Sequence, residues 1–174
     1  GAERFGCRII WSDRVDELLR PGLQGVVLFR THAFPDSVIE RVMSLKVPVL
    51  GTSSRKNGIE IPYVLWDNQN CIRNLIQCLV SLGHRRFTFV GGERGHAHNI
   101  ERLNAYKEGI ASYDDPDVQG VDISTNSWDS DVAFRTVIQD FQYWESTTAV
   151  ICANDLVAMG VVSALQVLGY RVPE

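Results

Sequence analysis

Short apolar runs alternate along the chain with segments whose apolar residues recur at helical spacing. The runs "GVVLF" (25–29), "VPVLG" (47–51) and "YVLW" (63–66) are predicted to form buried strands, because each is short and bounded by polar or turn-forming residues. Later runs predict three more strands: "RFTFV" (86–90), "GVDIS" (120–124) and "TAVIC" (148–152). The opening stretch "GAERFGCRII" (1–10) is typical of a helix end that leads into a strand.

Helices are predicted between these strands. In "PDSVIERVMSL" (35–45), proline and aspartate suit a first turn, and the apolar residues that follow have helical period. Asp67 or Asn68 is predicted to cap a long helix that ends at Gly83. Its predicted buried stripe comprises Ile72, Leu75, Ile76 and Leu79. Further helices are predicted in "NIERLNAYKEGI" (99–110), "DSDVAFRTVIQDF" (129–141) and "DLVAMGVVSALQVLG" (155–169). This alternation predicts an α/β fold with parallel strands, covered by helices on both faces.

The composition narrows the possible functions. Of 174 residues, 45% are hydrophobic and 22% are charged, and the net charge of −4 gives no support for a nucleic-acid-binding surface. No apolar run approaches the length of a membrane span, and no signal-peptide pattern opens the chain. The four cysteines, Cys7, Cys71, Cys78 and Cys152, stand in apolar contexts without a Cys-x-x-Cys pair. Buried, reduced thiols in a cytosolic protein are therefore favoured over disulfides or a metal site.

Two motifs are considered for a metal or a cofactor. His96 and His98 lack an acidic or cysteine partner at a metal-ligating spacing, so a solvated loop is favoured there. The loop "GGERG" (91–95) follows a strand and precedes a helix, but it fits neither the dinucleotide-binding pattern nor a P-loop. No metal and no cofactor is predicted.

Polar and aromatic residues gather where the predicted strands end, and parallel sheets bind ligands beyond those carboxyl ends. The strand-end residues include Thr52, Ser53, Trp66, Asp67, Asn126 to Trp128, Asn154 and Asp155. They include no nucleophile–base pair, which predicts a site that binds a ligand without reacting with it.

Asn154 and Asp155 stand side by side at the mouth of the last predicted strand. Asp155 is predicted to cap the following helix, where a carboxylate complements the unpaired N–H groups and the helix dipole. Asn154, which can both donate and accept, is then predicted to hydrogen-bond a hydroxylated ligand.

Three larger side chains each have two interpretations. Arg102 either pairs with Glu101 or Glu108 at the surface or presents its planar set of donors to a ligand. Trp66 and Trp128 are either core residues or aromatic walls of a site. Trp128 lies in the polar turn "STNSWDSD" before a helix, which suits a stacking surface.

Several strings together resemble the effector-binding core of the lac repressor/gal repressor (LacI/GalR) family. They are "SLGHRRFTFVGG", "ERLNAY" and "TTAVICANDLVAMGVVSALQVLGYRVPE", and "VPVLGTSS" and "VLWDN" fit the same template. The resemblance covers nearly the whole chain, and the first string favours repressors over their periplasmic sugar-binding relatives. It implies two Rossmann-like lobes with parallel sheets, of periplasmic-binding-protein-like type I, joined by a three-crossing hinge. We expect a partial N-terminal lobe over residues 1–66 and a partial C-terminal lobe over 67–174.

The resemblance also implies roles for five residues. Arg102 falls at the arginine that contacts the ligand, Trp128 at the aromatic residue that stacks on it, and Asn154 at the asparagine that hydrogen-bonds it. Trp66 falls at an aromatic position that lines the pocket at the hinge. Ser53 falls where many members have a ligand-binding aspartate, so the usual carboxylate clamp on sugar hydroxyls is absent on that side.

The family pattern extends beyond both ends of this sequence. We expect a fold truncated at both ends, without the first strand, the strands that return to the first lobe and the N-terminal helix-turn-helix headpiece. A further departure is mild: Ala105 replaces the family's glycine.

The resemblance implies the ligand-sensing domain of a bacterial transcriptional regulator, without a catalytic role. A small effector, such as a sugar or a related metabolite, would bind between the lobes and control DNA binding allosterically. The expected partners are this effector, a second copy in a homodimer, and operator DNA through the headpiece. The expected location is the cytoplasm, without a membrane partner.

Three alternatives stay open. The first is a periplasmic sugar-binding transport receptor, which an upstream signal peptide would identify. The second is a sensor module fused to another output domain, and the third is a nucleotide-dependent enzyme, which would need a phosphate-binding loop that the sequence does not offer.

The last predicted helix bears on the expected dimer, because it has more apolar side chains than one sheet face needs. Either part of this apolar surface faces a partner or all of it is buried within one lobe. The residues concerned are Val157, Met159, Val161, Val162, Ala164, Leu165 and Leu168.

Overall fold

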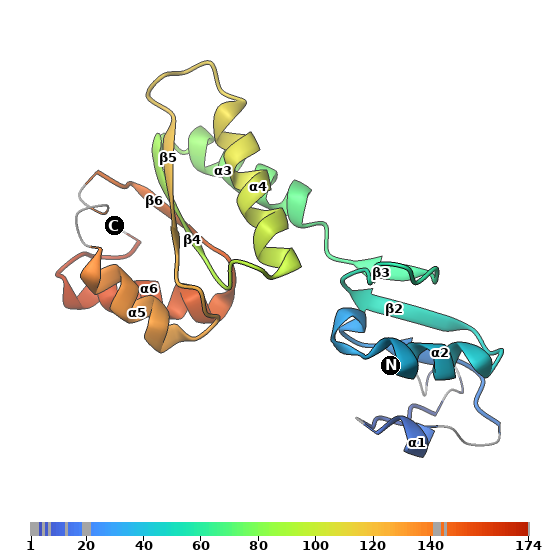
Figure 1. The fold of residues 1–174 in the computed structure, drawn as a ribbon. Helices are drawn as coiled ribbons and strands as arrows, with labels where there is room; N and C mark the ends of the chain where they lie inside the picture. Colours follow the sequence, from blue (N-terminus) through green and yellow to red (C-terminus); the bar gives the residue numbers. More distant parts are fainter. Residues whose placement is uncertain are drawn as a thin grey trace. The chain divides into compact units, whose positions relative to one another are not determined.

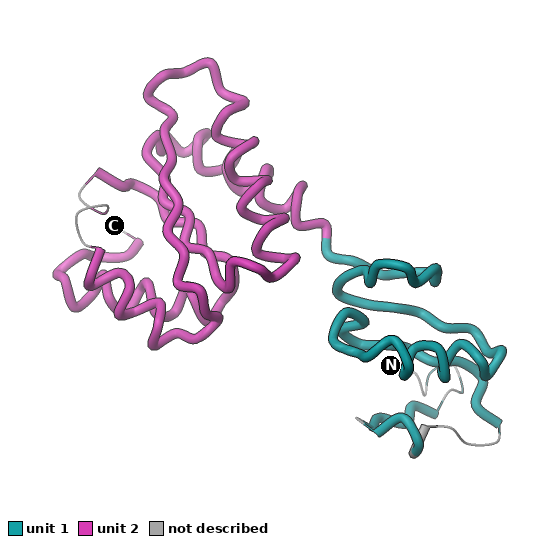
Figure 2. Tube along the Cα trace, in the orientation of Figure 1, with its two compact units in different colours: residues 1–66 teal, residues 67–174 magenta. Residues whose placement is uncertain are grey.

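The computed structural model describes residues 4, 6, 8–12, 14–18, 22–140, 144 and 146–173 (Figure 1). The chain divides into two compact units, unit 1 with residues 1–66 and unit 2 with residues 67–174 (Figure 2). Each unit has its own three-stranded sheet, and every strand pair in both sheets is parallel. The predicted fold class, α/β with parallel sheets in two halves, is confirmed.

Unit 1 contains a sheet with the strand order β1-β2-β3. Its elements are α1 (Val15–Leu18), β1 (Val26–Leu28), the 3-10 helix η2 (Thr31–Ala33), α2 (Asp36–Ser44), β2 (Val49–Ser53) and β3 (Tyr63–Leu65). Helix α2 packs on one face of this sheet, where Ile39 and Val42 meet the buried Leu28. The apolar spacing that predicts α2 is therefore the spacing that forms the core of unit 1.

Unit 2 contains a sheet with the strand order β5-β4-β6, so β4 is central. Its elements are α3 (Asn68–Ser81), β4 (Arg86–Gly91), α4 (Ala97–Ala111), β5 (Gln119–Ser124), α5 (Ser130–Gln139), β6 (Ala149–Cys152) and α6 (Asp155–Val167). Helices α3 and α4 pack on one face of the sheet, and α5 and α6 pack on the other. Both faces are covered, and the central strand β4 is buried from Phe87 to Val90, whereas most of the edge strand β5 is exposed.

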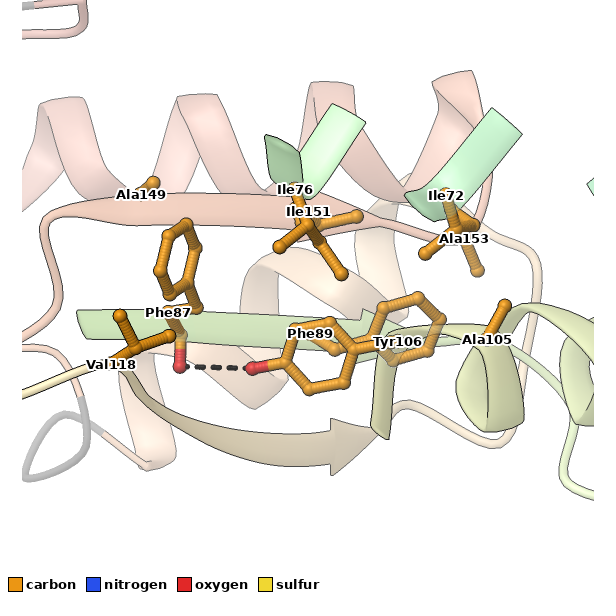
Figure 3. Close-up of a cluster of buried hydrophobic side chains, with 10 residues drawn as sticks. All are labelled: Ile72, Ile76, Phe87, Phe89, Ala105, Tyr106, Val118, Ala149, Ile151 and Ala153. Carbon is orange, nitrogen blue, oxygen red and sulfur yellow. Dashed lines mark hydrogen bonds between the residues drawn. The ribbon is translucent and has the colours of Figure 1, made fainter. Parts of the chain in front are cut away.

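The two faces of this sheet form two cores. On the α3–α4 face, Figure 3 shows Phe87 and Phe89 of β4 among Ile76, Tyr106 and their neighbours. The buried Tyr106 hydroxyl donates to the Phe87 carbonyl oxygen at 3.1 Å, so its polar group is satisfied inside the core (Figure 3). The core on the other face contains Val90, Ala133, Val137, Trp144, Val157, Val161, Ala164 and Leu165.

Two predictions about strands and helices need correction. Residues Arg8 to Ser12 form no strand, and the rest of the opening stretch lies largely outside the described residues. An apolar run becomes a strand only where a neighbouring strand supplies the backbone partners, and β1 pairs with β2 alone among the described residues. In α3 only part of the predicted stripe is buried: Ile72 and Ile76 are covered, whereas Leu75 is 42% exposed.

The cysteines depart from their predicted burial. Cys71 and Cys78 are exposed on α3, because the buried face of that helix is set by Ile72 and Ile76. Cys152 is partly buried at the end of β6, and the Cys7 prediction lies outside the described residues. The three described cysteines are free thiols, as predicted.

Candidate ligand-binding site

The candidate site lies at the carboxyl edge of the unit 2 sheet. Strand β4 ends at Gly91, and β6 ends at Cys152, so the loops that follow them leave from the same edge. The loop after β4 leads into α4, which carries Arg102, and the loop after β6 leads into α6 through Asn154. Parallel strands thus bring together residues that are about fifty positions apart in sequence.

Arg102 reaches from α4 to the end of β6. Its Nε–H donates to the Asn68 side-chain oxygen at 2.8 Å, and its Nη1 donates to the Ala153 carbonyl oxygen. Burial lowers the pKa of Arg102, and the nearby charges of Glu101 and Asp155 oppose that shift. Because an arginine pKa is so high, the side chain still carries its charge at neutral pH. The alternative of a surface ion pair with Glu101 or Glu108 is not seen among the described residues.

Asn154, and not Asp155, caps helix α6. The Asn154 side-chain oxygen accepts a hydrogen bond from the Val157 N–H at 2.8 Å, while the Asn154 backbone is extended, with φ −157°. Asp155 is already the first helical residue, and its exposed carboxylate stabilises the helix through the helix dipole rather than by capping. The predicted assignment of the cap to Asp155 is therefore wrong. Only the residue before the first turn can direct its side chain at the N–H groups of that turn.

The cap occupies only one end of the Asn154 amide. Its oxygen is used by Val157, and its Nδ2 group has no hydrogen-bond partner among the described residues. Asn154 is partly exposed, and it directly follows Ala153, whose carbonyl oxygen binds Arg102. An amide donor and a guanidinium therefore lie beside each other at the end of β6.

Trp128 packs against the loop that follows β4. A Cβ added at Gly92 would lie 2.5 Å from the Trp128 ring, so the indole rests directly on the glycine backbone. The indole and the His96 ring also meet in a T-shaped arrangement, with centroids 5.1 Å apart and an interplanar angle of 84°. Trp128 is partly exposed and packs against the core beneath it, so the core interpretation describes part of its environment, and its role as an aromatic wall stays a prediction.

The "HAH" histidines do not lie in a solvated loop. His96 caps α4 by accepting a hydrogen bond from the His98 N–H at 3.3 Å, and His98 lies within α4 itself. His98 approaches Asn68, with 3.1 Å between its Nδ1 and the Asn68 Nδ2. The loop prediction is wrong because α4 begins at Ala97, earlier than its apolar pattern indicates. In the part of the chain that the structure describes, no cluster of three or more histidine, cysteine or acidic residues could hold a metal ion.

Ser53 and Trp66 belong to unit 1, and the other predicted site residues belong to unit 2. Ser53 ends β2 with a left-handed backbone, φ +73°. Trp66 directly follows β3 and is 66% exposed, so it is not a core residue of unit 1. Their roles toward a ligand stay predictions.

Asn68 is a residue of this region that sequence reasoning considered only as a helix cap. Asp67 occupies that capping position, since its carboxylate accepts the Asn70 N–H at 3.1 Å. Asn68 is instead buried and hydrogen-bonds Arg102, Glu101 and His98. An asparagine at the start of an apolar helix gives no sequence signal for such a role, because its partners are at least thirty positions away.

Two side chains that could act as nucleophiles, Cys152 and Ser54, are partly or fully buried. Burial raises the pKa of the Cys152 thiol to about 12, so it stays protonated and unreactive at neutral pH. Ser54 is hydrogen-bonded to His32 in unit 1, but Ser54 is buried, and the pair joins η2 to the end of β2. Among the described residues, no helix is long and apolar enough to cross a membrane.

Comparison with known proteins identifies the family and the fold. Residues 76–174 match the family of periplasmic binding protein-like domains. The HTH-type transcriptional regulator CelR of Thermobifida fusca is 31% identical over 159 residues, which cover 87% of this chain and 45% of CelR. The chain spans less than half the length of the curated relatives it matches.

Two solved structures share the fold. A dimeric lac repressor superposes with a TM-score of 0.75 at 21% identity, covering 98% of this chain and 65% of the repressor. A periplasmic solute-binding protein of an ABC transporter from Actinobacillus succinogenes, with bound D-allose, has a TM-score of 0.75 at 18% identity and covers 89% of this chain and 57% of that protein. At these identities the structures establish the fold alone.

The curated relatives are transcriptional regulators, and the match over residues 76–174 covers more than half of the sequence. The chain therefore belongs to the family of periplasmic binding protein-like domains, and its resemblance to the effector-binding core of LacI-type regulators is confirmed.

Proposed function

We propose that this chain is the effector-binding domain of a LacI-type transcriptional regulator, without a catalytic role, which binds a small polar metabolite between two lobes. The observation that carries the proposal is the pairing of Arg102 with the end of β6, beside the Asn154 amide. Arg102 lies in α4 and Asn154 at the start of α6, and both retain donor groups that no described residue satisfies. A ligand with several hydroxyl groups offers acceptors for them.

Trp128 supports a sugar-like ligand. A partly exposed indole held flat against Gly92 is a rigid apolar surface, and the apolar face of a pyranose ring packs on such surfaces. Glu101 and Asp155 already lie in the electrostatic environment of Arg102. Their negative charges favour a neutral ligand over an anionic one at this arginine.

Regulation would operate through the relative orientation of the two units. In this proposal Ser53 and Trp66 of unit 1 contact the ligand from their side, and Arg102, Trp128 and Asn154 contact it from unit 2. A ligand that contacts both units prefers one orientation and so shifts the equilibrium between orientations. In the full-length regulator, which we place in the cytoplasm, that shift would change the affinity of an N-terminal headpiece for operator DNA.

The proposal is tested with the full-length protein and two probes of different charge. D-Allose serves as the neutral sugar and glucose 6-phosphate as the anionic one, and each is titrated by calorimetry and by thermal melts. We expect sugar binding that raises the melting temperature and that is strongly weakened in Arg102→Ala. If wild-type protein responds to neither probe nor to a wider panel of neutral saccharides, a sugar site in this domain is ruled out.

One other function has a specific observation in its favour. The fold matches the D-allose-bound transport protein as well as it matches the lac repressor. A periplasmic receptor would bind sugar but no DNA. Mobility-shift assays of the full-length protein with fragments of its own upstream region separate the two functions, because only the regulator is expected to retard one of them.

A further inference from the structure

Asn68 is a buried polar residue in the unit 2 network around Arg102. It is the first residue of α3 and is 5% exposed. Its neighbour Asp67 fixes the start of α3 by accepting hydrogen bonds from the Asn70 backbone N–H at 3.1 Å and side-chain Nδ2 at 2.7 Å. A buried amide needs partners for its oxygen and for its NH2 group, since unpaired polar groups in a protein interior are costly.

The Asn68 amide lies between a cation and an anion. Its oxygen accepts from the Arg102 Nε–H at 2.8 Å, and its Nδ2 donates to the Glu101 Oε2 at 2.6 Å. The same Nδ2 lies 3.1 Å from His98 Nδ1. These partners fix the orientation of the amide, because a guanidinium cannot accept a hydrogen bond and a carboxylate cannot donate one.

This arrangement determines which donors of Arg102 stay available. A guanidinium has five N–H donors, of which one is held by Asn68 and one by the Ala153 carbonyl. Three donors remain, and two fixed bonds set the direction in which they point. Glu101, the residue adjacent to Arg102, is held by the Asn68 amide. Without this amide, the Glu101 carboxylate would be free to bind the guanidinium itself.

We propose that Asn68 is a positioning residue for Arg102. It does not contact the ligand, and it acts by orienting the guanidinium and by keeping Glu101 away from it. Its effect on ligand binding rests on the proposed function, but its effect on the arginine does not. Since Asn68 is the second residue of unit 2, it also ties the orientation of Arg102 to the segment that enters this unit.

The first experiment observes Arg102 directly and needs no ligand. In ¹⁵N-labelled full chain, the Arg102 Nε–H resonance is identified by its absence in Arg102→Lys, and its exchange with water is measured. We expect Asn68→Ala to shift this resonance and to speed its exchange roughly tenfold or more, as expected for loss of a hydrogen bond to a charged group. An unchanged resonance in folded Asn68→Ala would overturn the proposal.

A conservative pair of variants separates positioning from loss of structure. Asn68→Asp keeps the acceptor for Arg102 but places a second carboxylate against Glu101, so the network should be disturbed. Adding Glu101→Gln supplies an amide donor for the new carboxylate, and the double variant is expected to restore slow exchange of the Arg102 Nε–H. Failure of the double variant to restore it, with wild-type far-UV circular dichroism, would also contradict the proposal.

The second experiment measures the consequence for binding, with D-allose as the probe. Asn68→Ala is expected to raise the dissociation constant roughly tenfold to a hundredfold. In an Arg102→Ala background it should have no further effect, because Asn68 acts through the arginine. Equal losses in both backgrounds would show that Asn68 acts independently. Absence of D-allose binding by the wild type would count against the proposed sugar site, and the exchange experiment would still decide the role of Asn68.

Discussion

At the scale of single residues, Asn154 combines a structural role with a proposed binding role. Its oxygen caps α6, and its NH2 group faces no acceptor among the described residues. An aspartate at the same position would offer the cap but no donor, and an alanine would offer neither. The two roles can therefore be separated by substitution.

We expect Asn154→Ala to lower the free energy of unfolding by about 1 kcal/mol through loss of the cap, and also to abolish ligand binding. Asn154→Asp should keep most of the stability, since a carboxylate caps well, but it should lose binding. Chemical denaturation and calorimetric titration of the two variants measure these effects.

The matched control is Asp155→Ala. The exposed Asp155 carboxylate stabilises α6 through the helix dipole, which is typically worth about 0.3–1 kcal/mol, so the loss should be smaller than for Asn154→Ala. A larger loss for Asp155→Ala would show that the cap assignment in solution differs from the one described above.

The sequence predicts single residues where a local pattern identifies them. Arg102 is predicted early in a helix and Trp128 in a polar turn, and both patterns predict a place at the carboxyl edge of a sheet. Both residues lie there. The sequence does not reveal that Asn154, and not Asp155, caps α6, because a shift of one residue in the start of this helix reverses their roles. Asn68 was missed as a partner of Arg102 because such long-range contacts leave no local pattern.

At the scale of secondary structure, the close approach of α5 and α6 depends on Gly160. A Cβ added there would clash with the Ser130 carbonyl oxygen and lie 2.8 Å from the Ala133 Cβ. Both atoms belong to α5, one as a backbone oxygen and the other as a Cβ, so neither can move unless α5 shifts. A similar glycine in α4, Gly109, instead faces the tip of Ile76, whose Cδ1 would lie 2.6 Å from the added atom.

These two glycines make a matched pair. In helix propensity alone, alanine is favoured over glycine by about 1 kcal/mol at either position. We expect Gly160→Ala to lower the free energy of unfolding by about 1–3 kcal/mol despite this gain, because overpacking displaces backbone. Gly109→Ala should cost clearly less, because the Ile76 side chain can change rotamer. Thermal and urea unfolding of both variants test the contrast, and equal losses would argue against a rigid α5–α6 contact.

The element pattern was predictable because the apolar periods of strands and helices differ. In unit 2 the strands β4 and β6 are rich in buried apolar residues, since helices cover both faces of their sheet. Exposure within a helix was less predictable. The apolar spacing predicts Leu75 on the buried stripe of α3, but Leu75 is 42% exposed, whereas Ile72 and Ile76 are buried and Leu79 is partly buried.

At the scale of the whole molecule, the two units differ in how completely they cover their sheets. In unit 1, Val27, Phe29 and Val64 are more than half exposed, whereas the central strand of unit 2 is buried from Phe87 to Val90. The division into two sheets followed from the family resemblance, because the strand–helix alternation by itself would equally fit one longer sheet.

Helix α6 presents an exposed apolar surface on unit 2. Val157, Val161 and Ala164 are buried against the sheet and α5, which leaves Leu156, Met159 and Val162 exposed by 48%, 62% and 37%. Complete burial of the apolar residues of α6 within unit 2, one of the two alternatives for this helix, is therefore excluded. Exposed side chains of this size on one helix are typical of a protein interface.

We expect the full-length protein to form a homodimer in which Met159 lies at the interface. Met159→Glu should then yield monomers in sedimentation velocity at micromolar concentration, because a charge at a desolvated interface lacks a partner. The free energy of unfolding of the isolated chain should change little, since this side chain is exposed. Leu82→Glu is the matched control: Leu82 is 70% exposed at the end of α3, away from α6 in the chain, and its substitution should leave the dimer intact. A monomeric wild type, or a Met159→Glu variant that stays dimeric, would remove α6 from the interface.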